Sequence, residues 1–171
     1  SILSGCDIIR FPAIVNRKYY SDRHDYRYRF DVSPHADRGN VYFHKINAIE
    51  GVLQDADWIF WLDDDAAFSQ PDRRLEEVVP ELLDDSVCAI FCSSPVNPQG
   101  WTFISSGNFF VRNSESGKEL IRLAKETSLD EVKAWWDEKS LRMFAYGDQD
   151  AIVCQIKTNK KFEKSVKVIA Y

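Results

Sequence analysis

A short uncharged run that ends in three consecutive aspartates constrains the fold more than any other part of the chain. Residues 58–62, Trp-Ile-Phe-Trp-Leu, carry only aromatic and aliphatic side chains, and Asp63, Asp64 and Asp65 follow directly. An apolar run of this length predicts a strand that is buried on both faces. In open α/β sheets ligands bind beyond the carboxyl ends of the strands. The three carboxylates therefore stand where a binding site is expected.

The aspartates allow two interpretations. Neighbouring carboxylates repel one another and favour a nearby cation. Their hard oxygen atoms suit Mg²⁺ or Mn²⁺, and a bound phosphate would complete the coordination. In the alternative, Asp63–Asp65 form a turn and cap a helix over Pro71–Val79. The residues of this stretch alone do not decide between a metal site and a cap.

The order of elements in the first part of the chain predicts an α/β fold. Apolar spacing and turn residues place strands and helices alternately, with strands at Ser1–Gly5, Tyr26–Val32 and 57–62 and helices at Phe11–His24 and Phe43–Gln54. The stripe that predicts the first helix consists of Ile14, Val15 and Lys18–Tyr19, which recur near helical spacing. This β-α-β-α-β order is typical of a mostly parallel sheet covered by helices, a three-layer α/β/α arrangement. A chain of 171 residues is long enough for one domain with a real core, so residues 1–171 are expected to form a single domain.

The second part of the chain continues the alternation. We expect a helix over Pro71–Asp84 that Pro80 interrupts, because proline breaks the hydrogen-bond pattern of a helix. The other expected elements are a strand at Val87–Cys92, a loop at Ser93–Gly100, a strand at Trp101–Arg112 interrupted by a small turn at 105–108, helices at Ser114–Thr127, Leu129–Leu141 and Ala151–Lys157, and a strand at Val166–Tyr171.

Composition and charge exclude several classes of protein. A net charge of −5 argues against a nucleic-acid surface, which needs clustered Lys and Arg. No uninterrupted apolar stretch reaches the length of a membrane span. The four cysteines lack the short paired spacings of a zinc site or a dense disulfide framework, so buried free thiols are expected. Free thiols favour a reducing compartment such as the cytoplasm.

Several motifs, in order along the chain, resemble the nucleotide-sugar glycosyltransferases of the GT-A fold. The chain is most similar to glycosyltransferase family 34, the galactosyl-, mannosyl- and xylosyltransferases. The resemblance covers about residues 14–157. It rests on Asn16–Tyr26, the lysine-led helix from Lys45, Trp58–Ala66 with its Asp-x-Asp, Ser106–Asn113, and Asp148–Ile152. A lone Asp-x-Asp is a weak signal, whereas the ordered set is specific.

The resemblance implies roles for the residues that would bind the donor. Asp63 and Asp65 match the outer positions of the Asp-x-Asp and would hold Mn²⁺ or Mg²⁺ at the donor diphosphate, and Asp63 is also a candidate for donor contact. Asn108 would contact the donor sugar, and Gly107 beside it would allow close approach of the backbone. Lys45 would reach the diphosphate. The alternatives are a turn-satisfying asparagine for Asn108 and a solvated lysine for Lys45.

The resemblance also implies the reaction type. Asp148 would bind sugar hydroxyls and Gln149 would lie beside the anomeric carbon. Because a glutamine cannot accept a proton as a general base, transfer would retain the anomeric configuration by attack on the same face. The alternative for the acidic residues is a helix cap, above all for Asp150. His24, His35 and His44 are expected to be structural or on the surface. Trp135, Trp136 and Tyr146 are candidates for an acceptor cleft or for the core.

The sequence thus predicts a metal-dependent, retaining hexosyl- or pentosyltransferase. Its donor is expected to be a UDP-sugar in preference to a GDP-sugar, and its acceptor a carbohydrate. The alternative is a non-catalytic nucleotide- or sugar-binding domain of the same fold, because the family's histidine-bearing segment would lie beyond Tyr171 or be absent. An acidic phosphohydrolase is disfavoured, since no Thr or Ser suitably follows the aspartates. If a signal anchor precedes Ser1, the Golgi lumen replaces the cytoplasm as the expected compartment.

Overall fold

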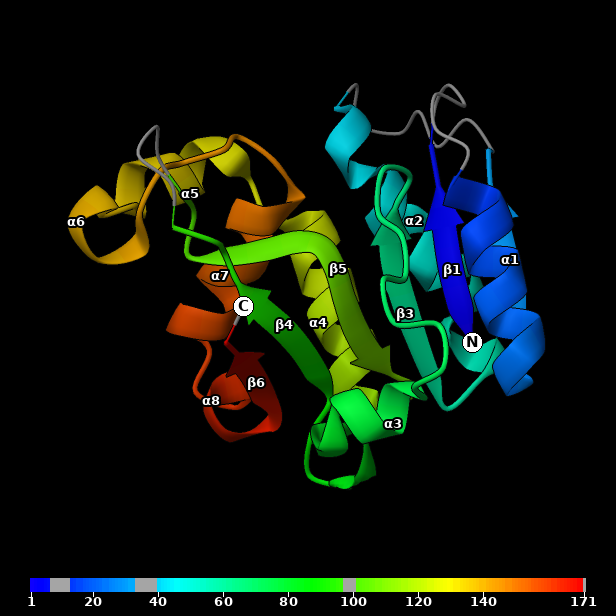
Figure 1. The fold of residues 1–171 in the computed structure, drawn as a ribbon. Coiled ribbons are helices and arrows are strands. Elements are labelled where there is room, and N and C mark those ends of the chain that lie inside the picture. The colour runs from blue at the N-terminus through cyan, green and yellow to red at the C-terminus, as the bar shows by residue number, and fades with distance from the viewer. Residues whose placement is uncertain (7–12, 33–39, 97–100, 171) are drawn as a thin grey trace.

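The strands form one mixed sheet in the computed structural model, which describes residues 1–6, 13–32, 40–96 and 101–170. Within these residues the six strands lie in the order β2-β1-β3-β5-β4-β6 (Figure 1). β1 is parallel to both of its neighbours and β4 is parallel to β6, whereas β5 runs antiparallel to β3 and β4. The strands are β1 (Ile2–Gly5), β2 (Tyr28–Asp31), β3 (Trp58–Asp63), β4 (Ala89–Ser93), β5 (Ile104–Arg112) and β6 (Val166–Ile169).

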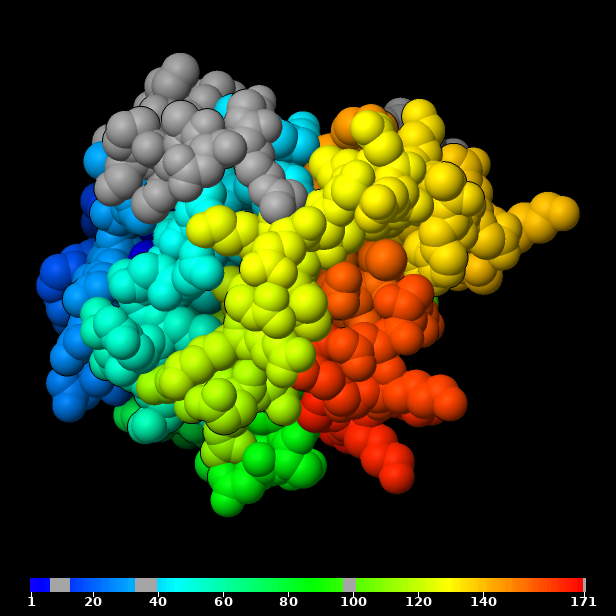
Figure 2. All heavy atoms as spheres, turned by 180° about the vertical axis from the view of Figure 1, so that it is seen from behind, coloured from blue at the N-terminus to red at the C-terminus, as the bar shows by residue number. Residues whose placement is uncertain are grey.

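Helices cover both faces of the sheet, which confirms the predicted three-layer α/β/α class. α2, α4 and α7 lie side by side on one face, as the view from behind shows (Figure 2), and α1 and α3 lie on the other face (Figure 1). The helices are α1 (Ala13–His24), α2 (His44–Val52), α3 (Leu75–Val78), α4 (Glu115–Glu126), α5 (Leu129–Trp135), α6 (Glu138–Leu141), α7 (Asp148–Thr158) and α8 (Phe162–Ser165), with 3₁₀ turns η1 (Val41–Phe43), η2 (Leu53–Asp55) and η3 (Pro80–Leu83).

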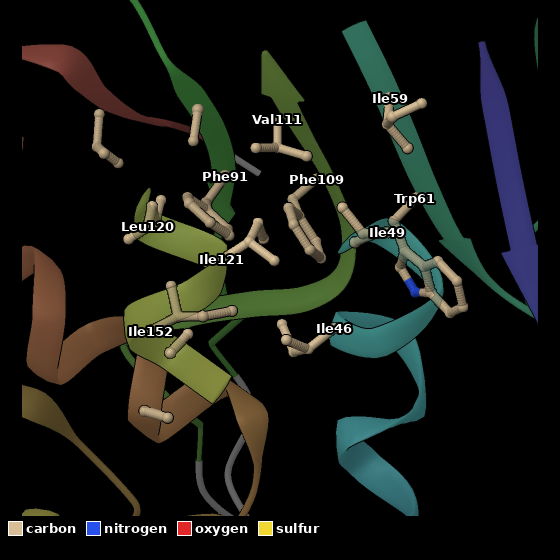
Figure 3. Packing of buried hydrophobic residues seen from close by; sticks show 14 of the residues in the cluster. Ile46, Ile49, Ile59, Trp61, Phe91, Phe109, Val111, Leu120, Ile121 and Ile152 are labelled. Carbon is tan, nitrogen blue, oxygen red and sulfur yellow. The ribbon is translucent and has the colours of Figure 1, made fainter. Parts of the chain in front are cut away.

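The central strands are buried on both sides because successive side chains point to opposite faces. On β3, Ile59 and Trp61 belong to a larger core beneath α2, α4 and α7. Phe60 and Leu62 belong to a smaller core beneath α1 and η3. Figure 3 shows side chains of the larger core converging from the strands and the helices on that face. The expectation of a fully buried strand is therefore confirmed for Ile59–Leu62, whereas Trp58 at its start is half-buried.

The buried face of α1 differs from the one that apolar spacing suggested. Val15 and Tyr19 are exposed, and the helix instead buries Arg17, Tyr20, Ser21 and His24. These four residues have the helical spacing of one face, but three of them are polar. The hydrophobic signal was misleading because this face contacts main-chain groups of residues 63–73 as well as the smaller core. Phe11 and Pro12, expected in the first turn, lie outside the described residues.

Two expected helices are shorter than predicted. The helix expected over Pro71–Asp84 is reduced to α3 and η3, which meet at Val79, a residue outside the α region before Pro80. A residue before proline is disfavoured in the α conformation. The helix expected over Leu129–Leu141 divides into α5 and α6, because Trp136 adopts extended backbone angles. In the described parts of the chain, no helix is long and apolar enough to cross a bilayer.

β5 corrects the turn expected at residues 105–108. It is one continuous strand that bends sharply (Figure 1). Its register with β4 shifts between Phe91 and Cys92, so Phe91 pairs with Phe109 while Cys92 pairs with Ser105. The small residues at this point accommodate a bulge rather than a chain reversal. None of the four cysteines, all of which lie in the described residues, forms a disulfide, as predicted, but only Cys6 and Cys88 are buried, whereas Cys92 and Cys154 are half-buried.

Two helical glycines provide a matched test of the packing between α4 and the sheet. A Cβ at Gly117 would lie 2.1 Å from the Arg112 carbonyl oxygen, whereas a Cβ at Gly51 has nothing within 4 Å. Alanine favours a helix over glycine by up to ~1 kcal/mol. Gly51→Ala should therefore raise the free energy of unfolding by about 0.5 kcal/mol, and Gly117→Ala should lower it by more than ~1 kcal/mol because α4 must move. Urea denaturation measures both, and a stabilising Gly117→Ala would contradict the close approach.

Candidate active site

A buried lysine joins the end of β3 to the start of α7. Lys45, on α2, places its Nζ atom 3.0 Å from Oδ1 of Asp63 and 3.8 Å from Oδ2 of Asp148. Its side chain is only 9% exposed. Burial by itself lowers the pKa of Lys45, but the two carboxylates outweigh it and leave the pKa raised. The ammonium group is thus charged inside the protein, and the alternative of a solvated lysine is wrong.

Ser106, on β5, holds the cluster together. Its carbonyl oxygen and its hydroxyl oxygen accept from Lys45 Nζ at 3.0 and 3.4 Å. Its backbone N–H donates to Oε1 of Gln149 at 3.0 Å, which fixes the orientation of that carboxamide. One residue of β5 therefore positions groups from α2 and from α7. The sequence analysis did not single out Ser106, although small residues before an asparagine in a strand were a visible signal.

The carboxyl group of Asp148 has a strongly raised pKa. Burial raises its pKa to about 6, although the charge of Lys45 and a hydrogen bond from Ser106 act in the opposite direction. Its Oδ2 atom is buried and, among the described residues, has no hydrogen-bond partner. A buried acceptor without a donor is unfavourable unless a ligand supplies one. Strongly perturbed groups of this kind mark functional sites.

Asp150 has a different task from Asp148 two residues earlier. Its carboxylate accepts from the backbone N–H groups of Ala145 and Gly147 at 3.2 and 3.0 Å. Gly147 is the N-cap of α7 and Asp150 is its third residue, which makes Asp150 half of a capping box. The capping alternative therefore accounts for Asp150, whereas Asp148 faces Lys45.

A buried arginine on α1 binds the backbone of the acidic turn that Asp63–Asp65 form. Arg17, on α1, is 0% exposed. Its guanidinium donates to the carbonyl oxygen of Asp63 at 2.7 Å, to that of Ala66 at 2.9 and 3.0 Å, and to the hydroxyl of Ser4. These bonds fix the backbone that carries Asp63, Asp64 and Asp65. Sequence reasoning missed Arg17; a charged residue three positions before Tyr20 on the same helix face was the available signal.

Other side chains of α1 continue this clamp along the loop after β3. The carboxamide of Asn16 accepts from the N–H of Phe68 at 2.7 Å and donates to its carbonyl at 3.0 Å. Tyr20 donates to the carbonyl of Arg73 at 2.7 Å and stacks on Phe68. A nitrogen of His24 lies 2.8 Å from the carbonyl of Pro71, a structural contact as expected. Side chains of α1 therefore order this loop in addition to the loop's own hydrogen bonds.

The remaining candidate residues differ in how near they lie to Lys45 and Asp63. Asp63 also accepts from the indole N–H of Trp61 at 2.7 Å, and Asp65 is exposed in the following turn. Gly107 lies next to Asp63, because a Cβ there would be 3.2 Å from Asp63 Oδ2. Asn108 pairs with Leu62 of the smaller core, so its side chain faces away from Lys45. Lys45, Asp63, Gly107, Asp148 and Gln149 come together, and Asn108 stands apart.

The cap and the metal site predicted at the aspartates have different outcomes. α3 begins at Leu75 after Arg74, far along the chain from Asp63–Asp65, so the alternative that the aspartates cap this helix is wrong. They do form a turn, in which Ala66 N–H donates to the Asp63 carbonyl at 3.0 Å. Among residues 1–6, 13–32, 40–96 and 101–170, no group of three or more His, Cys, Asp or Glu is arranged to hold a metal ion. Any ion at Asp63 and Asp65 would need further ligands, such as phosphate oxygens.

Comparison with known proteins shows that the chain is similar to galactosyltransferases. A profile of the galactosyl transferase GMA12/MNN10 family matches residues 9–89, which include Arg17, Lys45 and the acidic turn. An α-1,2-galactosyltransferase of Schizosaccharomyces pombe is 24% identical over 161 residues, covering 74% of this chain and 42% of the relative. A second, uncharacterised α-1,2-galactosyltransferase of that yeast is 27% identical over 139 residues, covering 63% and 37%. The chain thus spans about two fifths of the length of these relatives.

A solved structure shares the fold. A glycosyltransferase involved in the glycosylation of the major capsid of PBCV-1 superposes with a TM-score of 0.65, covering 99% of this chain and 80% of that one at 17% identity. This likeness supports the fold alone. Together with the family match, it confirms the predicted resemblance to GT-A glycosyltransferases of family 34.

The clamp beneath the acidic turn should be essential for stability. Arg17→Met removes the guanidinium donors of the Ala66 carbonyl and leaves the Asp63 carbonyl with only the Ala66 N–H, so it should lower the free energy of unfolding by about 3 kcal/mol. Arg23→Met is the matched control on the same helix: Arg23 pairs at the surface with Asp72, and its side chain is 44% exposed. The control should change stability by less than ~0.5 kcal/mol. Equal losses in urea denaturation would contradict the clamp.

Asp148 should make stability depend on pH. Its folded pKa of about 6 exceeds the ordinary value of 3.8. Between these values the native chain binds more protons at Asp148, so the contribution of this group to stability falls as pH rises from about 4 to about 6. Asp148→Asn removes that fall. The free energy of unfolding of the variant relative to the native chain should therefore increase by roughly 2 kcal/mol between pH 4 and pH 7.

The control for this pH experiment is Asp22→Asn, since the Asp22 side chain is 62% exposed in a surface pair with Lys18. Its difference from the native chain should stay constant across the same pH range. A constant difference for Asp148→Asn as well would show that Asp148 is not the perturbed group.

Proposed function

We propose that this chain is the donor-binding and catalytic domain of a hexosyltransferase that moves a sugar from a nucleotide-diphosphate sugar to a saccharide acceptor. The observation that carries the proposal is the buried cluster of Lys45, Asp63 and Asp148, with Gln149 oriented beside it by Ser106. The cluster lies at the C-terminal ends of β1 and β3, since Gly5 pairs with Asp63 there. Ligands of α/β sheets bind at this edge. The similarity to α-1,2-galactosyltransferases supports a hexose as the transferred sugar.

Charge balance supports a divalent cation as part of the donor site. Asp63, Asp65 and ionised Asp148 outweigh Lys45, so the region is negative before any donor binds. A nucleoside diphosphate adds more negative charge and would be repelled without a counter-ion. Asp65 is exposed and Asp63 lies at the end of β3, so both carboxylates are available to Mn²⁺ or Mg²⁺, with the diphosphate providing further oxygen ligands. When bound, the ion would neutralise the leaving diphosphate as a Lewis acid.

The chain's own residues have separable tasks in the proposed reaction. The Oδ2 atom of Asp148, which has no hydrogen-bond donor among the described residues, would accept a hydrogen bond from a hydroxyl of the donor sugar. Lys45 keeps Asp63 and Asp148 in place and supplies positive charge beneath the donor. Gln149 would present its carboxamide to the anomeric carbon, and Gly107 would leave room for the sugar beside Asp63. Asn108 would contact the donor only from the opposite face of β5.

Retention of the anomeric configuration is part of this proposal, because the carboxamide of Gln149 is not a suitable base. The acceptor oxygen would attack the anomeric carbon on the face from which the diphosphate departs. The bond between that carbon and the diphosphate oxygen breaks, and the acceptor proton passes to the leaving phosphate. A carboxamide cannot accept this proton but can stabilise positive charge that develops on the sugar.

Nucleotide titration tests the donor site. Isothermal titration of UDP and of GDP, each with and without Mn²⁺, should show manganese-dependent binding of UDP. The double variant Asp63→Asn/Asp65→Asn should lose at least about tenfold in affinity, because it removes the charge that holds the ion. Asp57→Asn, at the other end of the same strand, is the matched control and should bind like the native chain. Binding that ignores Mn²⁺ and the double variant would refute the metal role.

Turnover separates the enzyme from a binding domain of the same fold. Release of UDP from UDP-galactose, followed over time with and without saccharide acceptors, should be accelerated by an acceptor. The proton NMR spectrum of the product should show the same anomeric configuration as the donor. Nucleotide binding without any release of UDP would favour the non-catalytic alternative.

A further inference from the structure

Two exposed tyrosines flank the entrance to Asp148. Tyr42 and Tyr146 are 56% and 45% exposed. They come from segments joined by a hydrogen bond in which Asn40 Nδ2 donates to the Tyr146 carbonyl at 3.1 Å. The ring of Tyr42 packs over Gly147, where a Cβ would lie 3.3 Å from it. Gly147 directly precedes Asp148, so both rings border the buried cluster.

Tyr146 is held in a conformation that a tyrosine rarely adopts. Its φ is 60°, in the left-handed region. Such a conformation is unfavourable in a bulky residue, and strained residues of this kind cluster at functional sites. Asp150 fixes the N–H groups on both sides of Tyr146, and the tyrosine hydroxyl donates to Asp130 at 2.6 Å. The backbone is therefore strained in a way that keeps an aromatic ring at the surface.

An aromatic row leads away from Tyr146. Phe144 lies 5.4 Å from the Tyr146 ring, Trp136 lies 5.2 Å from Phe144, and Trp135 lies 6.2 Å from Trp136, each measured between ring centroids. Trp135 is 41% exposed. At this end of the row, Trp135, Asp137, Ser140, Leu141 and Lys157 line an open hollow of about 280 Å³. The row runs from α5 towards the start of α7 (Figure 1).

We propose that this aromatic row, with Tyr42 and Tyr146 as its stacking pair nearest Asp148, binds the acceptor, and that the acceptor is a neutral saccharide chain. The proposal rests on the proposed transferase function. Sugar rings present C–H faces that pack on aromatic rings, and hydroxyl edges that hydrogen-bond to polar groups at the rim. The rim carries both signs of charge, with Lys133 over the Tyr146 ring at 5.4 Å and Asp130 at its hydroxyl. Mixed charge favours a neutral ligand over an acidic or a basic one.

The placement of the row explains how two sugars would meet. A terminal sugar packed on the exposed part of Tyr42 or Tyr146 would direct a hydroxyl towards Asp148 and Gln149, where the proposed donor sugar lies. Further residues of the same chain would follow the row to the hollow beside Trp135. The exposed rings of Tyr42, Tyr146 and Trp135, which contribute little to the core, thereby acquire a function.

The test separates ring stacking from folding and from donor binding. Saturation-transfer NMR, with irradiation of the protein's aromatic protons in the presence of UDP and Mn²⁺, would be recorded for maltotriose, cellotriose and mannotriose. Transfer to at least one trisaccharide is expected in the native chain. Tyr42→Ala and Tyr146→Asn should each weaken its binding roughly tenfold, since asparagine tolerates the positive φ but has no ring. UDP affinity should be unchanged in both variants.

Two controls make the interpretation specific. Tyr146→Phe keeps the ring and loses the bond to Asp130, so it should retain saccharide binding. Tyr19→Ala removes a tyrosine on α1 that is 54% exposed and should have no effect. The proposed acceptor site on the aromatic row is contradicted if the native chain binds UDP but none of the trisaccharides. It is also contradicted if Tyr42→Ala and Tyr146→Asn bind the trisaccharides unchanged, or if Tyr146→Phe loses binding as Tyr146→Asn does. Absence of UDP binding in the native chain would instead refute the proposed function, and with it the proposed acceptor site on the aromatic row.

Discussion

The charge of Lys45, buried between Asp63 and Asp148, is the interaction on which the site depends. A buried ammonium group is costly unless carboxylates and hydrogen-bond acceptors surround it. Asp63, Asp148 and Ser106 provide this environment from β3, α7 and β5. Removing both carboxylates would leave the buried ammonium group without a compensating charge. The cluster therefore ties the parallel first half of the sheet to the helix that follows its antiparallel part, and it does so at the place where a ligand would bind.

A second buried cation, Arg17, fixes the backbone of the acidic turn, whereas Lys45 fixes the side chains of Asp63 and Asp148. Its guanidinium is satisfied by carbonyl oxygens of the acidic turn and by Ser4. The turn is thus shaped by α1, which lies on the opposite face of the sheet from α2. Together the two cations hold Asp63 from both sides: its carbonyl by Arg17, its carboxylate by Lys45. The carboxylate is positioned in advance, as the proposed binding of a metal ion and a diphosphate would require.

Comparison of sequence and structure shows where local patterns suffice and where they fail. The run at 58–62 predicted a doubly buried strand because its signal is the side chains' own apolarity, and the structure confirms it for all but the first of these residues. The stripe assigned to α1 failed because Val15 and Tyr19 are exposed while Arg17 is buried among carbonyl groups. The turn expected at 105–108 failed because small residues permit a bulged strand as readily as a reversal. The resemblance identified Lys45 as a site residue, although charge alone had suggested a solvated side chain.

Local sequence was sufficient for the α/β class, for the strand that carries the aspartates and for the family resemblance, since these follow from apolar spacing and from ordered motifs. It was not sufficient to show which polar side chains are buried. Arg17 and Ser106 acquired their tasks only when distant segments met, because burial of a charge depends on partners that may be separated by many residues in the chain. The pairing of Lys45 with Asp148 is such a case: only the folded sheet brings α2 and α7 to the same edge.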